Sequence, residues 1–191
     1  MKQFLITAIT SIVLFSSCKK DDTPEYNSNI KAPLSIEFDN VAGSSDLELD
    51  GGYKTANGDS IYITKLKYYV SNFKLTRTDG TVYTVPQEDS YFLVDESDEA
   101  THEAELEIPE GEYKTLSFTL GVDSLRSTMD ISQRTGVLDP AGAGADMYWT
   151  WNSGYIFFKL EGTSPQSMMG DVMYHIGGFG GYSSSTINNI K

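Results

Sequence analysis

The residues with the most restrictive chemistry in this 191-residue chain are its two histidines and six methionines. His175 follows Met173 by two positions and the pair Met168 and Met169 by seven and six. Imidazole and thioether suit copper(I), and alternation along a strand would place Met173 and His175 on one face. The spacing therefore indicates a soft-metal site. The competing interpretation is ordinary packing, because methionine commonly fills cores and a lone histidine beside a glycine turn is usually hydrogen-bonded.

The same inventory argues against catalysis by the chain alone. A Ser-His-acid hydrolase needs a positioned histidine, and neither His102 nor His175 lies near a Gly-x-Ser-x-Gly elbow. Acidic residues crowd around His102 in segment 95–107, where they could offer calcium ligands. That segment has no glycine-centred loop, so we interpret it as a solvated loop instead. The chain is predicted not to be an enzyme.

Charge and cysteine content exclude further classes. The formal net charge is −13, so a polyanion would be repelled over most of the surface, and nucleic-acid binding is not expected. The only cysteine is Cys18, which rules out an intrachain disulfide and a thiolate zinc cluster.

The position of Cys18 indicates a lipoprotein signal. An apolar run from Phe4 to Phe15 is too short to span a bilayer comfortably, and Leu14-Phe15-Ser16-Ser17-Cys18 resembles a bacterial lipobox. We expect residues 1–17 to be removed and Cys18 to be lipidated, so that the protein reaches the membrane through an N-terminal lipid anchor. An ordinary secretory signal cleaved nearby is the alternative.

Residues 18–33 are polar and are predicted to form the tether. Its first residues after the cysteine, Lys19-Lys20-Asp21-Asp22, resemble the acidic export tag of Bacteroidetes surface lipoproteins. We therefore expect an outer-membrane protein exposed at the cell surface, with a plain solvated linker as the alternative.

Alternating apolar and polar residues dominate the rest of the chain and favour strands over helices. Twelve tyrosines, nine phenylalanines and seventeen glycines support an all-β protein. Strands are expected at 34–38, at 60–75 with bulges at Lys65 and Asn72, at 81–85, at 91–94, at 116–120 and at 147–162. The last of these, with a bend at Gly154, is apolar on both faces and should be central. Residues 124–138 should form a long loop or a short helix.

Six sequence blocks, in order from Leu34 to the C-terminus, resemble the MbnP-like family, named for a methanobactin-associated copper protein. The blocks are Tyr68-Tyr69-Val70-Ser71-Asn72-Phe73-Lys74-Leu75, Asp89-Ser90-Tyr91-Phe92-Leu93-Val94-Asp95, Gly121-Val122-Asp123-Ser124, Gly136-Val137-Leu138-Asp139-Pro140, Met147 to Gly162, and Tyr174-His175-Ile176-Gly177-Gly178-Phe179. The resemblance predicts an immunoglobulin-like antiparallel β-sandwich over 34–191, lacking C-terminal strands of the family pattern. Such a shortened sheet would have an exposed edge.

The resemblance also implies secretion and copper binding. In founding members a partner di-haem enzyme related to cytochrome c peroxidase oxidises a tryptophan to kynurenine, which helps histidines hold the copper. His175 matches the family histidine, and Trp149 and Trp151 match a Met-x-Trp-x-Trp block that begins at Met147. We therefore predict His175, Met173 and Met147 as metal ligands, with both tryptophans in their surroundings.

Two positions depart from the copper-binding pattern. Ser71 stands where those members have a histidine, and Tyr91 stands about where they have the tryptophan. Serine is a poor copper(I) ligand and tyrosine cannot become kynurenine. The second hypothesis is accordingly a surface module that uses the same fold to bind a partner or another ligand.

Overall fold

The computed structural model describes residues 27–151 and 154–178. The predicted signal, Cys18 and most of the tether lie outside these residues. The strands are β1 (Lys31–Glu37), β2 (Val41–Ala42), β3 (Ser45–Asp46), β4 (Gly52–Lys54), β5 (Ser60–Arg77), β6 (Val82–Thr84), β7 (Tyr91–Asp95), β8 (Glu103–Pro109), β9 (Tyr113–Leu120), β10 (Tyr148–Trp149), β11 (Gly154–Thr163) and β12 (Asp171–Gly178). The helices are α1 (Ser124–Thr128) and the 3₁₀ turns η1 (Gln87–Asp89), η2 (Glu99–Thr101), η3 (Ile131–Gln133), η4 (Gly136–Leu138) and η5 (Ala145–Met147).

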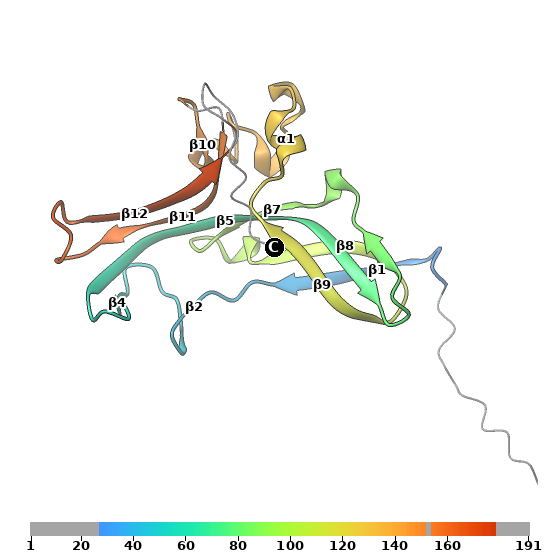
Figure 1. Ribbon diagram of the computed structural model, residues 1–191, viewed down its shortest axis with the longest axis horizontal. Helices are drawn as coiled ribbons and strands as arrows, with labels where there is room; N and C mark the ends of the chain where they lie inside the picture. The colour runs from blue at the N-terminus through green and yellow to red at the C-terminus, as the bar shows by residue number, and fades with distance from the viewer. Residues whose placement is uncertain (1–26, 152–153, 179–191) are drawn as a thin grey trace, which may run out of the picture.

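The long strand β5 organises the sheet. Its eighteen residues pair antiparallel with β4, β6, β7, β9 and β11, and β11 continues the sheet to β10 and β12 (Figure 1). One strand can serve so many partners because its register shifts beside Lys65 and again after Ser71, where Asn72 adopts a left-handed φ of 55°. Both predicted bulges are confirmed.

The two faces of this sheet bury different cores. Successive side chains of a strand point to opposite faces, so Tyr68 packs in one apolar cluster and Tyr69 in the other. The first cluster is closed by the two-stranded sheet β1–β8, whose inward residues include Leu106 and Ile108. The second is covered by the segment from α1 to β10, which stands on the opposite side of the sheet from β1 (Figure 1). The all-β antiparallel sandwich predicted from the sequence is confirmed.

The aromatic stretch 147–162 is not one strand, so that prediction is wrong. The chain reverses after Trp149, and β10 pairs antiparallel with β11 through Tyr148 opposite Tyr155 and Trp149 opposite Gly154. Gly154, which stands opposite Trp149 in this pairing, is buried at the start of β11. The half that continues as β11 is central, as expected.

The acidic segment 95–107 is also more ordered than predicted. After the turn η2 it becomes β8, with Glu103, Glu105 and Glu107 exposed and Ala104 and Leu106 buried. The charges therefore occupy one face of a strand, and the alternation of Glu with apolar residues fits a half-buried strand. No helix among the described residues is long and apolar enough to cross a membrane.

Candidate functional site

His175 lies on β12 opposite Lys159 of β11, and its ring nitrogen Nε2 is 2.8 Å from Oε1 of Glu161. Burial alone would raise the pKa of Glu161, but its hydrogen bond with His175 and the charges of Lys65 and Lys159 bring that pKa below its ordinary value. Glu161 is therefore a carboxylate that accepts from Nε2. This contact selects the tautomer in which Nδ1 carries the free lone pair.

A network of charges supports this pair from the adjacent strands. Register places Asp95, Lys67, Lys159 and His175 in one row across β7, β5, β11 and β12. Asp146 caps the row: its carboxylate lies 2.7 Å from the Lys159 ammonium and 3.1 Å from that of Lys65. Burial would raise the pKa of Asp146, yet its bonds to Lys159 and Lys65 lower it overall. On the face of β11 that borders the second core, compensated charges thus surround His175.

The other predicted ligands occupy different environments. Met173 shares the β12 face with His175 and is 66% exposed, whereas Met147 is fully buried in the second core and does not join them. Trp149 is half-buried over Gly177 of β12, where an added Cβ would come within 2.9 Å of the indole. Trp151 is 72% exposed, with its ring 5.6 Å from that of Trp149. The structure therefore places His175 and Met173 on one face of β12, with Trp149 over Gly177 two residues beyond His175, and leaves Met147 in the second core.

Ser71 and Tyr91 lie directly opposite each other in the β5–β7 register. They belong to a hydrogen-bonded group, the Asp123 cluster, made of Ser71, Asn72, Gln87, Tyr91 and Asp123. Asn72 Nδ2 donates to Ser71 Oγ at 2.9 Å and to Asp123 Oδ2 at 3.0 Å, while Gln87 Nε2 donates to Asp123 Oδ1 at 3.1 Å. The Tyr91 hydroxyl also donates to Asp123.

The donors determine the ionisation of this cluster. Burial by itself would raise the pKa of Asp123, but the hydrogen bonds from Tyr91, Asn72, the Arg126 backbone and Gln87 lower it overall. Burial raises the pKa of Tyr91, and its bond to the Asp123 carboxylate raises it further. At neutral pH the cluster is an ionised carboxylate surrounded by neutral donors. Ser71 is fully buried, and its hydroxyl donates a hydrogen bond to the Gly121 carbonyl at 2.7 Å. The Ser71 hydroxyl is therefore part of the internal hydrogen bonding of the fold.

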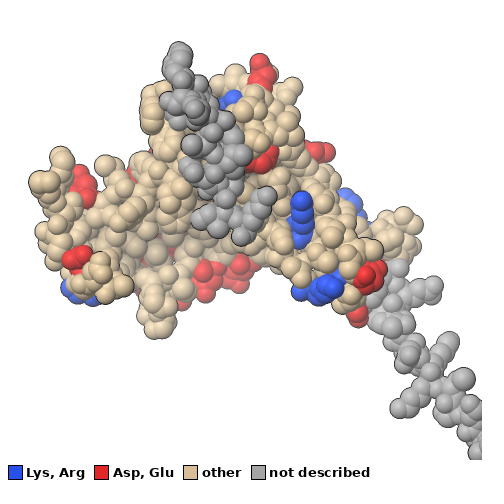
Figure 2. All heavy atoms as spheres, viewed as in Figure 1, with Lys and Arg blue, Asp and Glu red and all other residues tan. Residues whose placement is uncertain are grey.

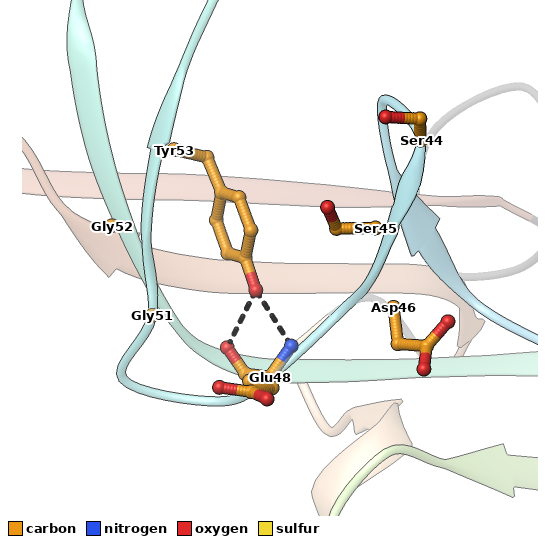
Figure 3. Close-up of a pocket in the computed structure, with 7 residues that line it drawn as sticks. All are labelled: Ser44, Ser45, Asp46, Glu48, Gly51, Gly52 and Tyr53. Carbon is orange, nitrogen blue, oxygen red and sulfur yellow. Dashed lines mark hydrogen bonds between the residues drawn. The ribbon is translucent and has the colours of Figure 1, made fainter.

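A separate polar pocket of about 530 Å³ lies between segments 44–48 and 51–53 (Figure 3). Figure 3 shows the Tyr53 ring between the two segments, with its hydroxyl on the backbone of Glu48. That hydroxyl accepts from the Glu48 nitrogen at 2.6 Å and donates to the Glu48 carbonyl at 3.0 Å. Tyr53 therefore ties the loop together, and the pocket contains only Asp46 and Glu48 as charged groups.

The donor set decides which metal the β12 face fits. Within residues 27–151 and 154–178, no three His, Cys, Asp or Glu side chains converge as a metal cage. A zinc or calcium centre of the usual kind is therefore not formed by the described residues. One imidazole oriented by a carboxylate, next to a thioether on the same face, instead suits a soft ion such as copper(I).

Taken together, the bulged central strand and the two cores define an antiparallel β-sandwich with two polar groups, the Asp123 cluster and the charged group around His175. The profile of the MbnP family matches residues 31–191, so the chain belongs to that family. Among solved structures, MbnP from Methylosinus trichosporium is similar, with a TM-score of 0.58 and 18% sequence identity over 78% of this chain. The chain spans 63% of the length of that protein. No curated protein matches the sequence.

Sequence reasoning missed both the partner of His175 and the Asp123 cluster. Lys65, Lys67, Lys159 and Glu161 alternate with apolar residues in β5 and β11, and that alternation was a signal for a charged face. Asp123 gave a weaker signal, because its side-chain partners come from three separate elements, β5, η1 and β7. Only the left-handed turn at Asn72 aims that side chain at Asp123.

Proposed function

We propose that this protein is a non-catalytic lipoprotein of the cell envelope that binds or handles copper at the face of β12 that carries His175 and Met173. His175 is its principal ligand and Met173 its soft second ligand. The observation that carries the proposal is the 2.8 Å contact between His175 Nε2 and Glu161. Metal-binding histidines typically donate their second ring nitrogen to a carboxylate, which fixes the ring and makes the free nitrogen more basic. Nδ1 is the nitrogen left for the ion.

The surroundings of the pair favour a soft cation. Met173 is exposed and supplies a thioether, which hard cations such as calcium do not select. The nearby lysines are neutralised by Asp146 and Glu161, so they do not present an uncompensated positive field to the ion. A bound copper ion would be either redox-active or carried as cargo. His175 and Met173 would hold it, and Glu161 would orient the imidazole.

The test is a copper(I) titration of the chain from Lys19 to Lys191 against a chromophoric chelator. His175→Ala should weaken affinity at least about tenfold, and Glu161→Gln about tenfold, as expected for loss of a partner that orients a ligand. His102→Ala is the matched control, since His102 also contacts a carboxylate, Glu96 at 3.9 Å, but lies in the turn before β8 with no methionine near it in the sequence. Equal affinity of wild type and His175→Ala would remove the site.

Envelope attachment forms the second part of the proposal. Cys18 follows a lipobox-like sequence, and the described fold begins only at Lys31, which leaves a polar segment long enough to act as a tether. In the native host, metabolic labelling with a fatty acid should mark the wild type but not Cys18→Ala. Protease accessibility on intact cells then separates the outer surface from the periplasmic side.

A di-haem enzyme related to cytochrome c peroxidase is the proposed partner. The chain holds two tryptophans, and Trp151 is the one whose ring lies open to an external protein. Intact mass of the native protein tests this, because conversion of a tryptophan to kynurenine changes the mass and a Trp151→Phe variant would abolish the change.

A second candidate function is a module that binds a partner or a non-metal ligand. The Asp123 cluster favours it, because Ser71 and Tyr91 are tied into internal hydrogen bonds at the positions where copper-binding relatives are expected to place ligands. Under this alternative the titration detects no specific copper(I) site, and the exposed loops and sheet edge carry the binding.

A further inference from the structure

Strand β12 forms an outer edge of the described sheet. Its only strand partner among the described residues is β11, and Figure 1 shows it on the outer side of that strand. Apolar side chains stand out on both of its faces: Met173 is 66% exposed, Tyr174 57% and Ile176 44%. An exposed strand with apolar side chains and open backbone groups is a ready template for pairing with another chain.

The edge lacks the devices that usually prevent such pairing. Strand β8, in the smaller sheet, exposes Glu103, Glu105 and Glu107 in alternation. Charged edges of that kind repel a second strand. Strand β12 holds a single acid, Asp171 at its start, and no lysine, arginine or proline. The end of the molecule formed by β11 and β12 is accordingly mostly tan in Figure 2.

We propose that two copies of this chain pair antiparallel through β12, about a two-fold axis at Tyr174. Directly opposed side chains in an antiparallel pair lie on the same face of the sheet. In a symmetric pair, one residue of β12 must therefore stand opposite its own copy across the axis. Axes at Tyr174 and at His175 give equally long overlaps within Asp171–Gly178, but the axis at His175 would set two imidazoles directly against each other. The axis at Tyr174 sets Tyr174 against its own copy and Val172 against Ile176, which places apolar against apolar along one face.

Charge is compatible with this occupant. Each chain carries a formal charge of −13, so association requires a contact without opposed acids. In the Tyr174 register Asp171 faces Gly177 of the second copy, and no two like charges stand opposite each other. The same edge therefore complements itself, and two sheets would join into one continuous sheet.

The pairing has a consequence on the other face of the strand. His175 of each copy lies opposite Met173 of the second copy, where directly opposed Cβ atoms are about 4.5–5.5 Å apart. Two imidazoles and two thioethers then line one face of the junction. This consequence rests on the proposed copper function, whereas the strand pairing itself needs no metal.

Sedimentation velocity of the chain from Lys19 to Lys191, with a strong chelator present, tests the pairing alone. The wild type should form dimers that increase with concentration. Tyr174→Lys should raise the dimer dissociation constant at least about tenfold, because it opposes two ammonium groups at the axis. Val82→Lys is the matched control, because Val82 is similarly exposed, at 59%, but lies on the short strand β6. This substitution should leave the dimer unchanged.

Cysteine cross-linking then tests the register. The chain from Lys19 contains no cysteine, so introduced thiols report alone. Residues opposed in an antiparallel pair have Cα atoms about 4.5–5.5 Å apart, within the range of a disulfide. Tyr174→Cys should form a covalent dimer on mild oxidation. Met173→Cys and His175→Cys should cross-link efficiently only when mixed with each other.

Either of two outcomes overturns the pairing. A monomer at all concentrations, with no Tyr174→Cys cross-link, would mean that another occupant, such as this chain's own residues 179–191, covers the edge. A dimer that Tyr174→Lys leaves intact would place the contact elsewhere. The two proposals can also be distinguished from each other. If His175→Ala loses copper affinity but still forms the dimer in the presence of chelator, the metal site and the strand pairing are independent.

Discussion

The Asp123 cluster and the face of β12 that carries His175 both hold polar side chains on the same sheet, but these side chains use their hydrogen bonds in opposite ways. In the cluster, Asn72, Gln87 and Tyr91 all donate to one half-buried carboxylate. On β12, Glu161 fixes one nitrogen of His175 and leaves the other nitrogen for a ligand. The difference teaches that hydrogen bonds can engage every polar side chain of a cluster inside the fold, whereas a pair at a sheet edge can leave one ring nitrogen for the ligand proposed above.

The largest expected effect would break the cluster. Asp123→Ala leaves the Tyr91 hydroxyl and the Asn72 and Gln87 amides without their shared acceptor, so the free energy of unfolding should fall by about 3 kcal/mol. Chemical denaturation measures this. Asp130→Ala is the control, because Asp130 also caps a short helical turn, through the Ser132 nitrogen, but is exposed. A comparable loss in both variants would reduce Asp123 to an ordinary cap.

A second change asks whether the cluster can be turned into a metal site. Ser71→His places a larger ring at a fully buried position, and overpacking of this kind costs about 1–3 kcal/mol. We expect lower stability and no gain in copper(I) affinity over the wild type. A stable variant with markedly tighter binding would show that the position is open, contrary to the account.

Acid should weaken the cluster in a defined direction. The pKa of Asp123 is lowered on folding from its ordinary value of 3.8, so its contribution to stability is present above that value and is lost as pH falls through the folded pKa. Urea unfolding of wild type and Asp123→Asn at several pH values checks this. The stability gap between them should be constant near neutrality and shrink below about pH 4. A gap that widens in acid would reverse the assigned ionisation.

The smallest effect concerns the charges that support His175. Lys159 is buried, with its side chain 6% exposed, and pairs with Asp146, which keeps Lys65 as a second partner. Removing one member of an ion pair is costly when it leaves a buried charge unpaired, but Asp146 is 44% exposed and keeps Lys65, so Lys159→Met should change stability by less than about 1 kcal/mol. Thermal unfolding measures it, and a collapse of the fold would assign Lys159 a larger role.

Much of the fold was predictable from periodicity. The alternation of apolar and polar residues shifts by one position at Lys65 and again at Asn72, and these shifts predicted the two bulges of β5. A bulge inserts one extra residue, so that the side chains on either side of it still point to the correct face of the sheet. The β10 reversal was not predictable in the same way. The run around Gly154 is apolar in either arrangement, and only the pairing of Trp149 with Gly154 distinguishes a hairpin from one long strand.

The sites were less predictable because their members are distant in sequence. Spacing alone placed Met173 beside His175, since strand alternation is local, but it could not place Glu161 across the sheet or bury Met147 in the second core. Likewise, Ser71 and Tyr91 could be aligned with family positions, whereas the carboxylate that joins them, Asp123, depends on a turn that follows β9.

The most direct test of the account is a parallel copper(I) titration of wild type, His175→Ala and Tyr91→Phe. If the open site is on β12, His175→Ala loses at least about tenfold in affinity while Tyr91→Phe, which removes only an internal hydrogen bond, binds as the wild type does. The opposite ranking, with affinity lost in Tyr91→Phe and kept in His175→Ala, would return the site to the Asp123 cluster and contradict the account.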